Sequence, residues 1–92
     1  MGASRPRRPR PQHDATYKAL CVILRKLREG HELTQRDLAD RIARPRSFVW
    51  KTEAAERRID AVELVRWCRA CGTDPIDVFK QLVSIMPGAI RH

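Results

Sequence analysis

The sequence has no long apolar run, and this absence excludes two classes of protein. No segment approaches the ~20 consecutive apolar residues that a helix needs to span a bilayer. The first residues carry arginine and proline but no apolar stretch of the kind found in secretory signals. We therefore expect a cytoplasmic chain without a membrane segment.

Cysteine is scarce, and its three copies are an odd number, which argues against a disulfide framework. Cys68 and Cys71 form a Cys-x-x-Cys pair, a spacing also seen in zinc and redox sites. Zinc normally needs four ligands, and the remaining candidates, Cys21, His13 and His31, have no paired spacing. We interpret the pair as small hydrophobic residues on an apolar helix face, and expect neither metal nor cofactor.

Signatures of catalysis and of a ligand domain are also absent. The sequence has no paired carboxylates, no nucleophile with a matching base and no glycine-rich phosphate loop, so we do not expect an enzyme. A chain of 92 residues has room for one domain, which leaves none for a separate small-molecule domain. Strand alternation and hairpin dipeptides are missing as well, so we predict an all-α fold.

Positive charge is in excess. Lysine and arginine number 19 against 11 acidic residues, for a net charge of +8. This balance favours a polyanionic partner over the alternative, which is good solubility alone. The hydrophobic content of 42% is sufficient for a packed core.

The composition divides the chain into three parts: a flexible basic arm at 1–13, a folded domain at 14–86 and a tail at 87–92. The prolines of the arm fix φ and lack a backbone donor, and the arm has nothing apolar to bury. Its arginines are Arg5, Arg7, Arg8 and Arg10.

Five short helices are predicted within the folded part. The first runs from Asp14 to Gly30, with Leu20, Leu24 and Leu27 at the spacing of one helix face. Thr34 and Asp37 have the spacing of a capping box and start the second helix.

The third helix runs from about Pro45 to Ala54 and turns Val49 and Thr52 inward, with Pro45 in its first turn. Asp60 and Glu63 form a second capping pair, and the fourth helix then continues to Gly72. Asp74 and Pro75 start the fifth, which ends at Pro87 and Gly88.

The segment from Leu24 to Phe79 contains an ordered set of residues: Leu24-Arg25-Lys26-Leu27-Arg28, Leu33-Thr34-Gln35-Arg36-Asp37-Leu38-Ala39, Ser47-Phe48-Val49, Lys51, Glu53, Glu56-Arg57-Arg58 and Thr73-Asp74-Pro75-Ile76-Asp77-Val78-Phe79. In this set the segment resembles the Cro/repressor-type helix-turn-helix domains of the xenobiotic response element family, and also the lambda-repressor-like domains. The resemblance implies a five-helix lambda-repressor-like fold that binds double-stranded DNA, such as bacterial nucleoid DNA, and regulates transcription.

The third helix is the expected recognition helix, because one α-helix fits the major groove and presents polar side chains to base edges. The resemblance implies that Arg46, Ser47 and Lys51 read bases, and Arg46 and Lys51 suit guanine. Trp50 also faces outward, toward DNA or a neighbouring helix. For Phe48 we expect packing or a backbone contact.

Phosphate contacts are expected around this helix. The resemblance assigns one to Gln35, and Arg44, Arg57 and Arg58 flank the recognition helix. The arm arginines are expected to contact phosphates or the minor groove. Between residues 41 and 58 there are six basic residues and two acidic ones. The resemblance gives Glu53 a structural role within the motif.

Three positions depart from the family pattern. Pro45 replaces a usual Ser or Thr helix cap. Thr52 replaces an aliphatic core residue, so its buried hydroxyl needs a carbonyl partner. Ala55 stands where glycine is common, which costs roughly 1 kcal/mol if φ is positive there.

Extra apolar residues near the end of the chain, Val83, Ile85, Met86 and Ile90, either complete the core or form a two-fold interface. We expect a homodimeric repressor on a palindromic site, because one helix reads few base pairs. Two alternatives stay open. One is an antitoxin or phage-derived module whose C-terminal tail binds a partner protein, and the other is binding of nucleic acid through charge alone.

Overall fold

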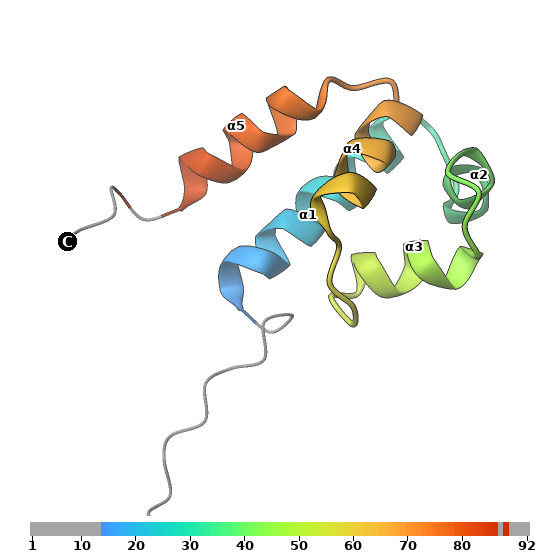
Figure 1. Ribbon diagram of the computed structural model, residues 1–92, viewed down its shortest axis with the longest axis horizontal. Helices are drawn as coiled ribbons and strands as arrows, with labels where there is room; N and C mark the ends of the chain where they lie inside the picture. The colour runs from blue at the N-terminus through green and yellow to red at the C-terminus, as the bar shows by residue number, and fades with distance from the viewer. Residues whose placement is uncertain (1–13, 87, 89–92) are drawn as a thin grey trace, which may run out of the picture.

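The computed structural model describes residues 14–86 and residue 88, and this part of the chain contains five α-helices and no strand (Figure 1). The predicted all-α, five-helix fold is therefore confirmed. The helices are α1 (Ala15–Gly30), α2 (Gln35–Arg41), α3 (Arg46–Glu53), α4 (Ala61–Ala70) and α5 (Pro75–Ile85). The predictions for the arm at 1–13, for Pro87 and for Ile90 lie outside the described residues.

Short-range side-chain caps fix where the helices begin. Thr34 and Asp37 exchange hydrogen bonds of 3.0 and 2.9 Å at the start of α2, and the two predicted capping boxes are both present. Pro45 lies at the N-cap of α3 and not in its first turn, and no side chain caps this helix. The start of α3 has no side-chain cap because the proline side chain has no hydrogen-bond acceptor.

One type of turn ends the first four helices. In each, the second residue after the helix has a positive φ, and the next backbone N–H bonds back to a carbonyl five residues earlier, as in a Schellman motif. The left-handed residues are Glu32, Ala43, Ala55 and Gly72, so only one of the four is glycine. The strain anticipated at Ala55 is confirmed by its φ of 58°.

The core is organised around Trp67 of α4, which is fully buried. Its indole N–H donates to the carbonyl of Leu24 in α1 at 3.3 Å, and its ring lies 6.2 Å from that of Phe48 in α3. α2 and α3 pack together on one side of α1 and α4, and α5 extends along the other side (Figure 1). The α2–α3 pair is thus supported by α1 and α4.

The first of the two alternatives for the apolar residues near the end of the chain, that they complete the core, is wrong for those the structure describes. Val83, Ile85 and Met86 are 64%, 48% and 48% exposed. Val78 and the half-buried Leu82 supply the inward face of α5, whereas about half or more of each of the other three residues is exposed.

Candidate nucleic-acid interface

The short helix α3 has two contrasting faces. Phe48, Val49 and Thr52 are buried, and the Thr52 hydroxyl donates to the Phe48 carbonyl at 2.7 Å, which is the partner that its burial requires. The opposite face is exposed and carries Arg46, Ser47, Trp50 and Lys51. The structure therefore brings all four predicted base-reading side chains together on one solvent face.

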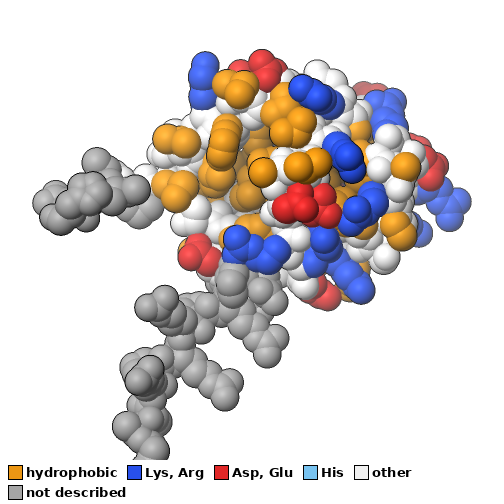
Figure 2. All heavy atoms as spheres, in the orientation of Figure 1, with side chains coloured by type: hydrophobic (Ala, Val, Ile, Leu, Met, Phe, Trp, Pro, Cys, Tyr) orange, Lys and Arg blue, Asp and Glu red, His pale blue; other side chains and the backbone are white. Residues whose placement is uncertain are grey.

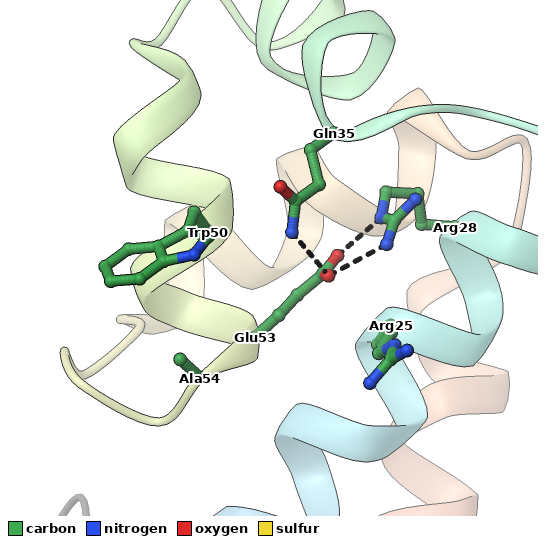
Figure 3. A pocket seen from close by; sticks show the side chains of 6 residues that line it. All are labelled: Arg25, Arg28, Gln35, Trp50, Glu53 and Ala54. Carbon is green, nitrogen blue, oxygen red and sulfur yellow. Dashed lines mark hydrogen bonds and ion pairs between the residues drawn. The ribbon is translucent and has the colours of Figure 1, made fainter.

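Trp50 borders a hollow of about 300 Å³ between α3, α1 and the start of α2 (Figure 3). Gln35, Arg25 and Arg28 also line this hollow. Trp50 is 46% exposed, so it presents part of a flat apolar ring beside basic and amide groups. Such a surface is suited to a sugar or a thymine methyl group.

A buried polar cluster lies below this surface (Figure 3). The Arg28 guanidinium donates to both oxygens of Glu53, at 2.6 and 2.9 Å, and to the Leu33 carbonyl at 2.7 Å. Gln35 donates its amide N–H to Glu53 at 3.1 Å. The cluster joins α1, α2 and α3, and confirms that Glu53 pairs inside the motif.

Gln35 is therefore placed at the edge of the interface with part of its amide already engaged. One N–H of the side chain bonds Glu53, and the residue is partly exposed at the first position of α2. Its phosphate contact stays a prediction, and would use the remaining amide donor together with the helix-end backbone N–H groups.

Arg44 and Arg57 flank α3 at its two ends in the sequence and meet in space. Each guanidinium carbon lies 4.4 Å from the centre of the Phe48 ring. Both also contact Glu63, with N–O distances of 2.9 Å from Arg44 and 3.2 Å from Arg57. Phe48 is 6% exposed, which confirms the expected packing role.

Glu63 has two tasks in this arrangement. Its carboxylate accepts a hydrogen bond from the Asp60 backbone N–H at 2.9 Å in the capping box of α4, and it forms ion pairs with Arg44 and Arg57. Partial burial of the carboxyl would raise the pKa of Glu63. The backbone hydrogen bond and the arginine charges outweigh that effect and hold its pKa below the ordinary value.

Arg58 lies on the opposite side of the loop after α3. Its guanidinium carbon is 5.0 Å from the centre of the Tyr17 ring, and the Tyr17 hydroxyl donates to the Arg57 carbonyl at 2.6 Å. Burial raises the pKa of Tyr17 to about 12. The phenol stays protonated at neutral pH and anchors the loop that carries both predicted phosphate contacts.

Sequence reasoning missed two residues of this region, Arg25 and Glu63. Arg25 lies one helix turn before Arg28 and so faces the same hollow, a spacing that the sequence does offer as a signal. Glu63 was interpreted only as a cap. Nothing in the local sequence indicates that it also binds Arg57, which is 6 residues away, and Arg44, which is 19 residues away.

The cysteines show the properties of core residues. Cys21, Cys68 and Cys71 are buried, and within the described residues no group of three or more potential ligands could hold a metal ion. Burial raises the pKa values of the Cys68 and Cys71 thiols to about 11. Both are therefore protonated and unreactive at neutral pH.

Apolar and basic side chains gather on different sides of the surface. Figure 2 shows hydrophobic side chains gathered on the side of α5, whereas lysine and arginine dominate the side of α2 and α3. Among the described residues, no helix is both long and apolar enough to cross a bilayer.

Comparisons with known proteins agree with this geometry. No curated protein sequence matches significantly. Residues 19–78 match the family model described as a helix-turn-helix domain. An XRE-family-like protein from Pseudomonas syringae pv. tomato has a similar structure, with 45% identity, a TM-score of 0.76 and coverage of 82% of this chain and 92% of the other.

Two more distant structures share the fold. A wild-type restriction-modification controller protein has 18% identity and a TM-score of 0.72, over 78% of this chain and 94% of the other. The clp gene regulator ClgR from Corynebacterium glutamicum has 23% identity and a TM-score of 0.70, over 82% and 97%. The family match, the identity to the Pseudomonas protein and the two-faced α3 lead to one conclusion: the chain belongs to the helix-turn-helix domain family, as an XRE-type DNA-binding protein.

Proposed function

We propose that this protein is a sequence-specific transcription regulator, and that it represses by occupying a palindromic operator as a homodimer. The observation that carries the proposal is the exposed face of α3. It presents Arg46, Ser47, Trp50 and Lys51 while Arg28 and Glu53 hold the helix from behind.

Base reading would use the outer face of α3 in the major groove, with α2 crossing the backbone. Arg46 and Lys51 can each donate to guanine O6 and N7, and a good contact of this type discriminates by roughly 1–3 kcal/mol. The Ser47 hydroxyl can hydrogen-bond to more than one kind of base, and Trp50 offers an apolar contact to a thymine methyl.

Phosphate contacts would come from both sides of α3. Gln35 lies at the start of α2, and Arg44, Arg57 and Arg58 lie in the turns before and after the recognition helix. These contacts fix the position on the duplex without reading sequence. The arm arginines, which lie outside the described residues, would add contacts to the minor groove or to phosphates.

Dimerisation would use α5. Ile76, Phe79 and Val83 follow a helical spacing, are 55%, 55% and 64% exposed, and line an apolar hollow of about 390 Å³. A two-fold interface here would pair two recognition helices on half-sites about one DNA turn apart. Two proteins that share the fold are a restriction-modification controller protein and a clp gene regulator, which is consistent with a regulatory role.

The test is selection of bound sites from a pool of random duplexes. We expect a recovered site with two-fold symmetry, preferred over random duplex by ~10³-fold or more. Recovery of unrelated sequences with no common site would contradict sequence-specific regulation. A common site without symmetry would contradict the palindrome and the dimer.

A further inference from the structure

Two of the arginines proposed to bind phosphate are already paired with an acid of the same chain. Glu63 lies 2.9 Å from Arg44 and 3.2 Å from Arg57. A second Arg57 nitrogen lies 3.3 Å from the same carboxylate. Arg44 and Arg57 keep 40% and 30% of their side chains exposed, so both stay accessible from solvent.

Both arginines pack on the Phe48 ring. Both guanidinium groups lie over it at 4.4 Å, and the ring itself is held in the core beside Trp67. Glu63 is fixed as well, because its carboxylate is bonded to the Asp60 backbone N–H at 2.9 Å. Arg44 and Arg57, which lie in the turns before and after α3, are therefore held between a ring on α3 and a carboxylate on α4.

A carboxylate bonded to two guanidinium groups takes the position that a phosphate oxygen would take in contact with them. We propose that Glu63 is an internal counter-anion, which lowers the affinity of the protein for any duplex by competing with DNA phosphates for Arg44 and Arg57. This inference rests on the proposed DNA-binding function and names a residue that limits it.

The opposing effect would be preorganisation, in which Glu63 aids binding by holding the arginines. The net charge of the cluster favours the loss of affinity over preorganisation. With Glu63 ionised the cluster carries one net positive charge, whereas a neutral residue at this position leaves two. A phosphate close to the arginines is also close to the carboxylate, so the repulsion is local and weakly screened.

The experiment compares Glu63→Gln with the wild type and with Asp77→Asn. Glutamine retains an acceptor for the Asp60 N–H, as capping boxes allow. Asp77→Asn changes net charge equally but lies on α5, away from the cluster. Affinity is measured for the selected operator and for a random duplex over a range of salt concentrations.

We expect Glu63→Gln to bind both duplexes roughly 3- to 10-fold more tightly than Asp77→Asn at low salt. The salt dependence should steepen by up to about 1 in log–log slope, because more counterions are released. In a background with Arg44→Gln and Arg57→Gln the gain should disappear. Unchanged or weaker binding by folded Glu63→Gln, or a gain that persists in this background, would overturn the inference.

A measurement on the wild type keeps the inference testable if Glu63→Gln does not fold. The side-chain nitrogen NMR signals of Arg44 and Arg57 should shift when random duplex is added, and signals that stay constant at saturation would overturn it. A different result would refute the proposed function and leave the inference intact. The wild type would bind the selected operator and random duplex equally well, while Glu63→Gln would still bind both more tightly.

Discussion

Arg28 and Glu53 form an ion pair with two hydrogen bonds that joins the last turn of α1 to the last residue of α3. The distances are 2.6 Å from Nε to Oε2 and 2.9 Å from Nη2 to Oε1, and the side chains are 10% and 5% exposed. The pair ties α3 to α1 with Glu53 turned inward, and Arg46, Ser47, Trp50 and Lys51 lie on the opposite, exposed face of α3.

Replacing Arg28 by alanine should be strongly destabilising. It leaves Glu53 buried with only the Gln35 amide as a partner, and breaking a buried pair from one side typically costs about 3–5 kcal/mol. The matched control is Arg25→Ala, whose pair with Glu29 is exposed and should contribute about 0–1 kcal/mol. Urea unfolding of both variants measures the difference, and equal losses would contradict the structural role of Arg28.

Glycine at position 43 should stabilise the protein. Ala43 is exposed in the turn between α2 and α3 and has a φ of 55°, where a Cβ is strained. We expect Ala43→Gly to raise the free energy of unfolding by about 0.5–1 kcal/mol. Ala54→Gly is the control, since Ala54 is exposed with a φ of −81° and should lose stability instead. Thermal unfolding of the two variants should move in opposite directions; a shift the same way would refute the account of the turn.

Acid should weaken the cluster at Glu63. Its pKa is lowered in the folded state, so its contribution is present above the ordinary carboxyl pKa and is lost as the pH falls through the folded value. We therefore expect Glu63→Gln to be less stable than the wild type at pH 7, with the gap narrowing by pH 3. Urea unfolding at the two pH values tests this. A gap that widens in acid would show that the ionised carboxylate does not stabilise the fold.

Self-association should depend on α5. Placing a charge at Val83, which lines the apolar hollow, should break a two-fold interface because two carboxylates would be buried against each other. We expect Val83→Glu to sediment as a monomer where the wild type is a dimer. Val62→Glu is matched in chemistry and exposure, 59% against 64%, but lies on α4, and should remain dimeric. Monomeric wild type, both free and on DNA, would remove the dimer from the proposal.

The sequence predicted the features that depend on local chemistry. Helix starts were found because capping pairs such as Thr34 with Asp37 leave a signature within four residues. The outward face of α3 followed from helical spacing and from the family resemblance, and the structure places its four outward residues as expected.

Two kinds of feature were not predicted: local turns that leave no glycine signature, and contacts between distant parts of the chain. Left-handed residues at Glu32 and Ala43 escaped notice because neither is glycine. The double use of Glu63 required knowing that Arg44, 19 residues away, folds against it. The sequence also did not predict that Val83 is exposed. The spacing of apolar residues along α5 does not say which of its two apolar faces packs on the core.

The central claim is that the outer face of α3 chooses the operator, and binding by variants of Arg46 and Lys51 tests it most directly. Arg46→Ala and Lys51→Ala should each weaken binding to the selected operator by about 1–3 kcal/mol and relax the preference at one base position. Arg66→Ala and Arg69→Ala, both exposed on α4, should leave that preference unchanged. If the Arg46 and Lys51 variants kept the full preference for the operator over random duplex, α3 would not be the element that reads the sequence.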